Sequence, residues 1–357
     1  MARALRLAER GLYTTTPNPR VGCVIVKAGK VVGEGWHERA GEAHAEVHAL
    51  HAAGESALGA TAYVTLEPCS HHGRTPPCAD ALIAAGVSRV VAAMQDPNPQ
   101  VTGRGIARLQ ATGIDAECGL LEADARELNI GFVSRMTRGR PWLRMKVAAS
   151  LDGKTALANG VSQWITGPEA RNDGHRWRAR ACAILSGIGT VREDDPRLNV
   201  RGVETPRQPV KVIVDSQLDL SLNAKLLDAG EVIVATASDD QNKASALRGV
   251  GVDILHLPSV DGKVDLHALL QELGRRGINE LHVEGGGRLN GALMAAGLVD
   301  ELLLYLAPCL IGDAARGMFT LPALASLEDK KRLVIRDARM VGSDLRILAR
   351  LNSVTGG

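Results

Sequence analysis

The sequence has few aromatic residues: Phe, Trp and Tyr make up 3% of its 357 residues. Proteins that track single-stranded nucleic acid stack the bases on aromatic side chains, so this composition argues against such a surface. An excess of basic charge is also missing, because 42 Lys and Arg residues stand against 40 Asp and Glu residues. Without a global positive field, any phosphate recognition must be local. We expect neither nucleic acid nor a membrane as a partner.

Long apolar runs are absent as well. No run of about 18 apolar residues, the length that crosses a membrane, occurs, and the most apolar late segment is interrupted by Asp300 and Glu301. The N-terminal residues alternate charge with Leu and Ala and contain no signal-peptide block. The six cysteines are mostly isolated in apolar surroundings, which indicates reduced thiols and not a disulfide framework. We therefore expect a soluble, cytoplasmic protein.

The order of predicted elements indicates two α/β domains. At 357 residues the chain exceeds an ordinary domain of about 100–200 residues. Short strand-like runs alternate with helical stretches, which predicts mostly parallel sheets covered by helices. The composition changes at TRGRP, so we place the boundary near Arg140, between domains at residues 1–139 and 141–357. The end of the chain reads as a strand hairpin around 342–344, which predicts a mixed second sheet.

Candidate metal ligands lie in two short segments, HAEVHALHAAG at 44–54 and EPCSHHGRTPPC at 67–78. Cysteine thiolate and neutral imidazole are good zinc ligands, and a catalytic zinc site has three protein ligands and an open position for water. The residues that fit this count are His44, Cys69 and Cys78.

Two other metal sites are compatible with these segments. His44 and His48 are four residues apart, as in the metalloprotease motif H-E-x-x-H. In that motif the glutamate directly follows the first histidine, whereas Glu46 comes two residues after it. A structural zinc site would need a fourth ligand, and the candidates are His71, His72 and Cys23.

The zinc nucleobase deaminases combine H-x-E with P-C-x-x-C, and their glutamate moves protons without binding the metal. This chain has H-A-E and P-C, with eight residues between Cys69 and Cys78. Residues two apart on a helix point in different directions, so His44 and Glu46 can share a site only in the first helical turn. Zinc lowers the pKa of bound water, and Glu46 can pass that proton to a departing amine. The expected reaction replaces an amino group with a carbonyl.

The whole chain resembles the bifunctional deaminase/reductase family of riboflavin biosynthesis. The segment PCSHHGRTPPC is similar to that family's variant of the deaminase signature, and TTPNPRVGCVIV is similar to its substrate-contacting segment. The resemblance implies an N-terminal cytidine-deaminase-like domain followed by a dihydrofolate-reductase-like α/β domain. It also implies zinc-dependent deamination of a diamino-pyrimidinone that carries a ribosylamino 5′-phosphate. NADPH-dependent reduction of the ribosyl group to ribityl would follow.

The resemblance assigns roles in the first half residue by residue. Asn18 and His71 match positions that contact the pyrimidine. His48 and His51, on the helix that follows His44, are expected to pack against neighbours or to support the ligands. We also expect a homo-oligomer that acts on a phosphorylated small molecule.

In the second half, HVEGGGRLNGAL reads as a strand, three glycines and a helix. Such a turn lets a backbone approach a phosphate at a helix N-terminus. Asn290 replaces the last glycine of G-x-G-x-x-G, so a Rossmann fingerprint is unsupported, and from the residues alone a turn without a ligand stays open. By resemblance, the cofactor positions are Ala148, Trp164, Thr190, Asp194, Gly286, Gly287 and Arg288. The substrate positions are Ser162, Arg178, Leu198, Arg201 and Glu284. The candidates for polarising the ribose end are Lys146 and Asp194.

Two functions of other classes compete with this interpretation. One is a deaminase that edits RNA or DNA, against which the near-neutral charge and the few aromatics argue. The other is a zinc-stabilised binding module without catalytic activity, which bound metal together with catalytic silence would favour.

Overall fold

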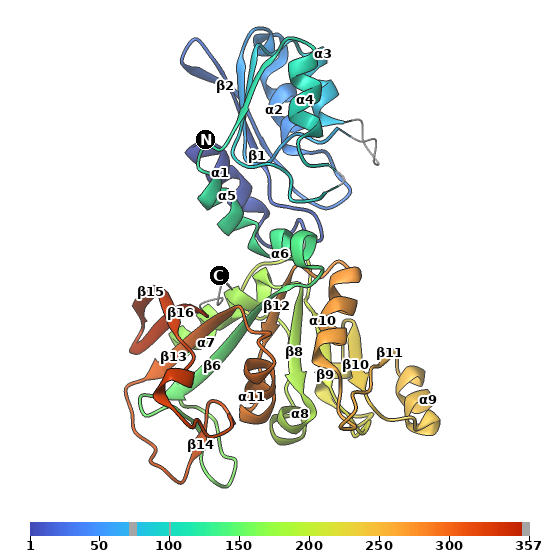
Figure 1. Cartoon of the computed structure of the whole chain (residues 1–357), viewed down its shortest axis with the longest axis vertical. Helices are drawn as coiled ribbons and strands as arrows, with labels where there is room; N and C mark the ends of the chain where they lie inside the picture. The colour runs from blue at the N-terminus through green and yellow to red at the C-terminus, as the bar shows by residue number, and fades with distance from the viewer. Residues whose placement is uncertain (71–76, 100, 352–357) are drawn as a thin grey trace. The chain divides into compact units, whose positions relative to one another are not determined.

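The structure is a computed structural model that describes residues 1–70, 77–99 and 101–351. The chain folds into two compact units (Figure 1). Unit 1 comprises Met1–Arg140 and Gly277–Asn279, and unit 2 comprises Pro141–Arg276 and Glu280–Gly357. Each unit has its own main sheet and its own core.

Unit 1 is built on a five-stranded sheet with helices between the strands. Its strands are β1 (Gly22–Lys27), β2 (Lys30–Trp36), β3 (Thr61–Val64), β4 (Arg89–Ala92) and β5 (Asp115–Cys118). Its α-helices are α1 (Ala2–Ala8), α2 (Ala45–Ala53), α3 (Cys78–Ala84), α4 (Arg104–Ala111), α5 (Glu122–Leu128) and α6 (Ile130–Arg138), and its 3-10 helices are η1 (Glu9–Gly11) and η2 (Gly54–Ala57). The strand order is β2-β1-β3-β4-β5. Strands β3, β4 and β5 run parallel, which requires crossover connections, and α3 and α4 lie within them.

Helix α2 packs closely against β2 at two glycines. A Cβ atom on Gly33 would lie 2.2 Å from the carbonyl oxygen of Ala49, and one on Gly35 would lie 2.5 Å from that of Ala45. A larger residue at either position would push the helix away from the strand. The facing Ala45 and Ala49 are fully buried. This contact sets the position of the helix N-terminus, where His44 is the N-cap residue.

Unit 2 contains a nine-stranded sheet and a small two-stranded one. Its strands are β6 (Trp142–Ser150), β7 (Lys154–Ala156), β8 (Ala183–Gly187), β9 (Val210–Val214), β10 (Val232–Thr236), β11 (Val252–His256), β12 (Glu280–Val283), β13 (Glu301–Ala307), β14 (Arg316–Gly317), β15 (Leu333–Val341) and β16 (Asp344–Leu351). Its α-helices are α7 (Pro168–Arg180), α8 (Ile188–Asp194), α9 (Gln241–Gly249), α10 (Leu266–Arg275) and α11 (Gly287–Ala295), and its 3-10 helices are η3 (Lys225–Leu227) and η4 (Leu327–Asp329).

The large sheet is mixed, with the strand order β11-β10-β9-β8-β12-β6-β13-β16-β15. The strands from β11 to β13 in that order are parallel, whereas β16 pairs antiparallel with both β13 and β15. The α/β class and the mixed character of the second sheet, both predicted from the sequence, are confirmed. The C-terminal hairpin is also confirmed, and its turn contains Gly342 at a φ of 61°, in the left-handed region that glycine favours.

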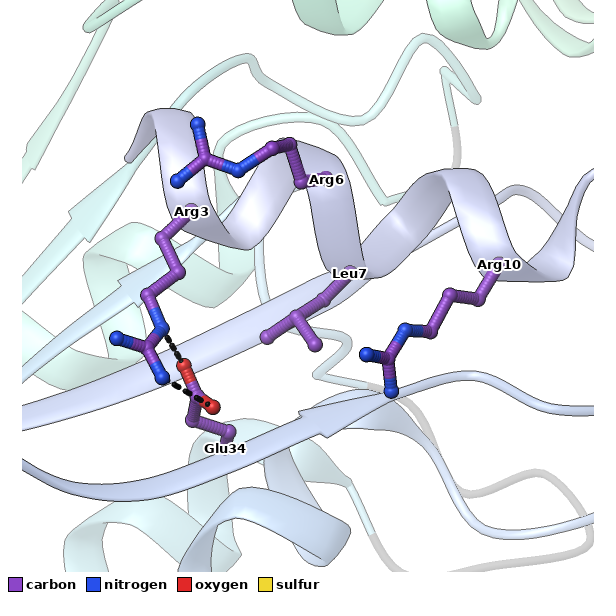
Figure 2. A pocket seen from close by; sticks show the side chains of 5 residues that line it. All are labelled: Arg3, Arg6, Leu7, Arg10 and Glu34. Atoms are coloured by element: carbon purple, nitrogen blue, oxygen red, sulfur yellow. Dashed lines mark hydrogen bonds and ion pairs between the residues drawn. The ribbon is translucent and has the colours of Figure 1, made fainter.

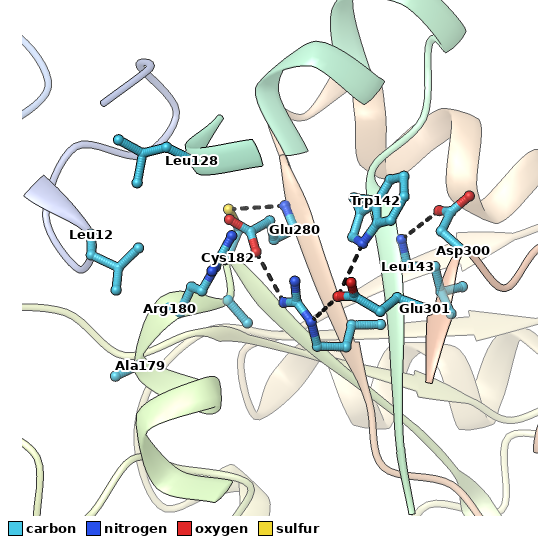
Figure 3. Close-up of polar contacts among 12 residues, drawn as sticks. Leu12, Leu128, Trp142, Leu143, Ala179, Arg180, Cys182, Glu280, Asp300 and Glu301 are labelled. Carbon is cyan, nitrogen blue, oxygen red and sulfur yellow. Dashed lines mark hydrogen bonds and ion pairs between the residues drawn. The ribbon is translucent and has the colours of Figure 1, made fainter. Parts of the chain in front are cut away.

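A buried ionic network ties three neighbouring strands of unit 2 to helix α7 (Figure 3). Arg144 on β6 is 2% exposed. It donates from Nη1 to Glu280 Oε2 at 3.0 Å and from Nε to Glu301 Oε2 at 2.6 Å. Arg180 on α7 donates to the same Glu280 oxygen at 2.7 Å. Such a network is costly to break at one partner only, because the remaining charge is left buried.

Within the described residues, none of the helices has both the length and the apolar character needed to cross a membrane.

Candidate active sites

Three of the predicted metal ligands meet in unit 1. One donor atom each from His44, Cys69 and Cys78 lies within 4.8 Å of the other two. His44 Nδ1 is 3.1 Å from Cys78 Sγ and 3.6 Å from Cys69 Sγ. His44 comes from the N-cap of α2, Cys69 from the loop after β3, and Cys78 from the first residue of α3. A set of one imidazole and two thiols suits zinc, and three protein ligands leave one position for water.

The surroundings of Cys69 favour its thiolate form. The hydrogen bond with the Cys78 side chain lowers the pKa of Cys69 to about 4, and His44 contributes to the same shift. The backbone N–H of Cys78 also donates to Cys69 Sγ at 3.2 Å. A thiolate held by these donors is the form that binds a metal cation.

Glu46 lies beside these ligands but does not belong to the group. It is 3% exposed and sits in the first turn of α2. Burial raises its pKa to about 7, and the neighbouring Cys69 adds to the rise. A metal dication at the three ligands would favour the carboxylate and offset this rise. The place of the Glu46 carboxyl group beside the three ligands suits a group that exchanges a proton there.

Asn18 is held by a histidine that the sequence did not single out. Asn18 Nδ2 lies 3.0 Å from His37 Nε2, and His37 Nδ1 lies 3.1 Å from the carbonyl oxygen of Ala43. Burial lowers the pKa of His37, which favours the neutral ring. The neutral tautomer that satisfies both contacts donates from Nδ1 and accepts at Nε2. The Asn18 amide is therefore oriented by a buried ring that also packs edge-on against His44, with 5.3 Å between the ring centroids.

Glu67 is a second residue whose role the sequence did not reveal. It is 3% exposed, and its carboxylate accepts four backbone N–H groups at 2.9–3.2 Å. The donors are Asp96, Gly103, Gly105 and Ile106. These bonds fasten the segment that leads into Cys69 to the start of α4, where a carboxylate also complements the helix dipole. In the sequence, Glu67 is visible only as the first residue of E-P-C, which does not show that its side chain is buried.

The other metal candidates do not join the group within the described chain. His48 packs against β2, because a Cβ atom on Gly35 would lie 2.5 Å from His48 Cβ. His51 is exposed, and Cys23 is fully buried outside the group. His71 and His72 lie outside the described residues.

Unit 2 contains a cavity of about 1590 Å³ at the large sheet. All the predicted cofactor and substrate positions of the second half line it. These are Lys146, Ala148, Ser162, Trp164, Arg178, Thr190, Asp194, Leu198, Arg201, Glu284, Gly286, Gly287 and Arg288. They come from segments spread over more than a hundred residues, and the fold brings them to one hollow of a size suited to a large ligand.

An ion pair and a lysine lie on one side of this cavity. Arg178 on α7 donates to Glu284 from Nε at 2.5 Å and from Nη2 at 2.8 Å, and its Nη1 donates to the carbonyl oxygen of Asn199 at 2.9 Å. Burial alone would raise the pKa of Glu284, but Arg178, His282 and Lys146 hold it well below its usual value. Burial lowers the pKa of Lys146, which Arg178 also lowers and Glu284 raises.

The donors of Arg178 are thus largely occupied within the protein. The Arg201 guanidinium donates from Nη1 to Asn199 Oδ1 at 2.6 Å, which leaves more of its donors available to a ligand than those of Arg178. Burial and the nearby Arg178 lower the pKa of Arg201. Its backbone N–H donates to His175 Nδ1 at 3.2 Å. Burial also lowers the pKa of His175 to about 4, with a contribution from Arg178. His175, which the sequence analysis missed, lines the same cavity.

The glycine turn after β12 forms another wall of the cavity. Gly286 is the N-cap residue of α11, and a Cβ atom there would lie 3.6 Å from Thr190 Oγ1 in the neighbouring helix α8. A Cβ atom on Gly287 would lie 3.0 Å from the carbonyl oxygen of Gly317. Nearby, Ser162 Oγ donates to Asp194 Oδ1 at 3.3 Å. Asp194 is hydrogen-bonded to Ser162, whereas Lys146 interacts electrostatically with Glu284 and Arg178. The two candidate polarising groups therefore belong to separate networks in one cavity.

Basic side chains outnumber acidic ones around the cavity. The acidic lining residues are Glu193, Asp194 and Glu284, whereas the basic ones are Lys146, Arg171, Arg178, Arg192, Arg197, Arg201, Lys263, Arg288 and Arg316. This local excess, in a chain of almost neutral charge, suits a ligand that carries several phosphate groups.

A smaller hollow lies on helix α1 of unit 1 and is lined by Arg3, Arg6, Leu7, Arg10 and Glu34 (Figure 2). Arg3 Nη2 donates to Glu34 Oε2 at 2.8 Å, and Arg10 stacks over Trp36 with its Cζ 4.7 Å from the ring centroid. These contacts account for two of the three arginines. None of the predicted site residues belongs to this hollow.

Two family models match the chain. The one described as the cytidine and deoxycytidylate deaminase zinc-binding region matches residues 1–94, and the one described as the RibD C-terminal domain matches residues 141–345. Relatives match almost the whole length. The riboflavin biosynthesis protein RibD of Escherichia coli is 52% identical, over 97% of this chain and 96% of its own. That of Haemophilus influenzae is 47% identical, over 97% of this chain and 95% of its own.

Solved structures agree with these matches. Form 1 of Acinetobacter baumannii RibD is 44% identical and superposes with a TM-score of 0.92, covering 99% of this chain and 98% of its own. A deaminase/reductase from Thermotoga maritima, 32% identical, has a TM-score of 0.87 and covers 98% of this chain and 97% of its own. Both halves of the chain, with a zinc-type ligand set in the first and a large basic cavity in the second, are accounted for by these relatives. The chain belongs to the RibD family of riboflavin biosynthesis proteins and is a bifunctional deaminase and reductase.

Proposed function

We propose that the first domain, residues 1–139, hydrolyses the ring amine of 2,5-diamino-6-ribosylamino-pyrimidinone 5′-phosphate at a zinc ion held by His44, Cys69 and Cys78. Zinc, when bound, lowers the pKa of the water that attacks the ring carbon. Glu46 accepts the proton of that water and delivers it to the departing amine, which leaves as ammonia. The close approach of the three donor atoms beside a buried glutamate supports this assignment.

Recognition of the pyrimidine is assigned to Asn18 and His71. For Asn18 the support is its contact with His37, because a fixed amide presents its remaining donor and acceptor in one orientation. His71 lies outside the described residues, and its assignment rests on the family resemblance.

The second domain, residues 141–357, is proposed to reduce the ribosyl group of the deaminated product with NADPH as cofactor. NADPH, when bound, supplies the hydride that reduces C1′. The bond between C1′ and the ring oxygen breaks, and that oxygen takes up a proton to become a hydroxyl. Lys146 and Asp194 polarise this end of the sugar. The product is 5-amino-6-(5-phosphoribitylamino)uracil.

The proposed roles divide the cavity between two ligands. The cofactor contacts are Ala148, Trp164, Thr190, Asp194, Gly286, Gly287 and Arg288. The substrate contacts are Ser162, Arg178, Leu198, Arg201 and Glu284. Arg201, whose guanidinium has fewer partners within the protein than that of Arg178, is the better placed of the two for the 5′-phosphate, which guanidinium can bind through two hydrogen bonds.

One assay tests both halves of this function. The protein is incubated with the diamino compound, with and without NADPH, while ammonia release and NADPH absorbance are followed separately. Ammonia should appear in both mixtures, and NADPH should be consumed only as the deaminated product accumulates. Absence of ammonia release from a zinc-loaded protein would contradict the substrate assignment.

A cytoplasmic homo-oligomer is part of the proposal. The free cysteines, including both proposed ligands, suit a reducing compartment. Strand β15 is the edge of the large sheet and exposes Leu333, Val334, Ile335 and Met340, and an apolar edge of this kind is suited to pairing with another chain. Light scattering of the purified protein would measure its mass in solution.

A further inference from the structure

The cavity of unit 2 follows the large sheet across four neighbouring strands. In the strand order these are β6, β12, β8 and β9. Lys146 and Ala148 line it on β6, Glu284 and Gly286 follow β12, and Thr190 follows β8. Val214 and Ser216 line it at the end of β9. Neighbouring strands lie about 4.8 Å apart, so the cavity extends over roughly 14 Å from β6 to β9.

This order gives a bound dinucleotide a direction, if the proposed reduction is correct. The hydride donor must meet the sugar beside Lys146 and Glu284, at the β6 and β12 side. The glycine turn after β12, which faces Thr190 after β8, can approach the bridging phosphates. The adenosine half must then lie beyond β8, over the end of β9.

The segments that follow β9 contribute one charged group to this end, which is a lysine. Arg192, on α8, also lines the cavity, but it pairs with Asp219, which follows β9, at 3.3 Å. Among the lining residues from 214 to 266, which are Val214, Ser216, Lys263, Val264 and Leu266, the charge is carried by Lys263. Asp215 is fully buried and does not line the cavity, and its carboxylate accepts the backbone N–H of Leu220. A carboxylate at an adenosine ribose favours NAD by accepting from the 2′-hydroxyl, whereas a basic group accommodates the 2′-phosphate of NADP.

The position of Lys263 is set by the end of β9. The backbone N–H of Val264 donates to Ser216 Oγ at 3.3 Å, which holds the turn that carries Lys263 against the strand end. The Lys263 side chain is 76% exposed and pairs with Asp261 at 3.3 Å. An exposed ion pair of this kind is weak, so the ammonium can turn toward a phosphate at little cost.

We propose that Lys263 binds the 2′-phosphate of the adenosine ribose and is the residue that makes the reductase prefer NADPH to NADH. This inference rests on the proposed reduction by NADPH. Lys263 is a specificity residue, since it lies at the end of the cavity remote from the reacting sugar.

Binding of fragments tests this without catalysis. Calorimetry should show that the wild-type protein binds adenosine 2′,5′-bisphosphate more tightly than AMP. Lys263→Ala should weaken the binding of the bisphosphate by about tenfold or more, as expected for the loss of one charge-assisted contact. The affinity for AMP should not change. Lys263→Arg should retain the preference. Lys243→Ala is the matched control, because Lys243 pairs with Asp219 at 3.5 Å near the same strand end but does not line the cavity.

Steady-state kinetics with the deaminated substrate separate the possible failures. In Lys263→Ala and Lys263→Glu the KM for NADPH should rise while kcat at saturation and the KM for NADH stay near their wild-type values. If the wild-type enzyme uses NADH as well as NADPH, the NADPH assignment itself is wrong. If the wild type prefers NADPH and both variants keep that preference, the role of Lys263 is wrong and the proposed function stands. An unchanged kcat for the reduction at saturating NADPH would show that the reductase domain of each variant is folded.

Discussion

Arg178 and Glu284 form a two-point ion pair on one side of the reductase cavity, with N–O distances of 2.5 and 2.8 Å and side chains that are each 15% exposed. The pair joins helix α7 to the segment after β12, and it holds the pKa of Glu284 well below its usual value against the effect of burial. A carboxyl group with a lowered pKa contributes stability above its ordinary titration range. That contribution is lost as the pH falls through its pKa in the folded protein.

Breaking one side of this pair should therefore destabilise the second domain. We expect Arg178→Met to lower its free energy of unfolding by about 3–5 kcal/mol, because Glu284 is left buried without its partner. The double variant Arg178→Met with Glu284→Leu should recover part of this lost free energy of unfolding. Its stability should also fall less in acid than that of the wild-type protein, because Glu284 no longer titrates. Urea unfolding at neutral and acidic pH measures both effects. A loss of stability in the double variant equal to the sum of the losses in Arg178→Met and Glu284→Leu would show that the pair is not coupled.

Replacement of one proposed metal ligand should release the metal. We expect Cys78→Ser to retain far less zinc than the wild-type protein, because two ligands bind more weakly than three and serine is a poor zinc ligand. Elemental analysis of the purified variant measures its zinc content. Cys118→Ser serves as the control, since Cys118 is exposed and outside the ligand group. A full zinc equivalent with normal deamination in Cys78→Ser would remove Cys78 from the site.

Glu46 is expected to transfer protons without holding the metal. Glu46→Gln should keep its zinc while ammonia release falls by about a hundredfold or more, the usual contribution of a general acid–base group. The matched control is Glu42→Gln, at an exposed glutamate just before the helix. Loss of zinc together with activity would instead make Glu46 a ligand.

The two activities should be separable by substitution. Glu46→Gln should consume no NADPH with the diamino compound but oxidise it at a near wild-type rate when given the deaminated intermediate. Asp194→Asn should release ammonia normally while hydride transfer slows. The reason is that the two proposed sites belong to two compact units with separate sheets. Slow reduction of the supplied intermediate by Glu46→Gln would show that the sites are coupled.

Much of the architecture was predictable because it depends on local patterns. The alternation of strands and helices in unit 2 was predictable because the strands from β8 to β12 are short, mostly apolar runs bounded by turn residues. The hairpin at Gly342 was predictable for the same reason. The grouping of His44, Cys69 and Cys78 was predictable because imidazole and thiol side chains can be recognised as possible metal ligands from the sequence alone.

Other features depend on contacts between residues far apart in the chain. His37 and Asn18 are 19 residues apart, and a lone histidine carries no signal of the partner that fixes its tautomer. Glu67 reveals its role only when the start of α4 folds back onto it. The sequence showed that Arg178 and Glu284 matched substrate positions, but not that they bind each other.

The sequence by itself determined the chemistry available to this protein: an imidazole, two thiols and a glutamate at deaminase spacing, and a glycine turn after a strand. Tertiary structure alone decided which side chains are free to meet a ligand. Arg178 and Glu284 are brought into contact by the fold, and their charged groups bond to each other within the protein. Arg201 and Lys263 line the same cavity and have more exposed side chains. The physical reason is that desolvation forces buried charges to pair, and which charges are buried is set by packing between segments distant in sequence.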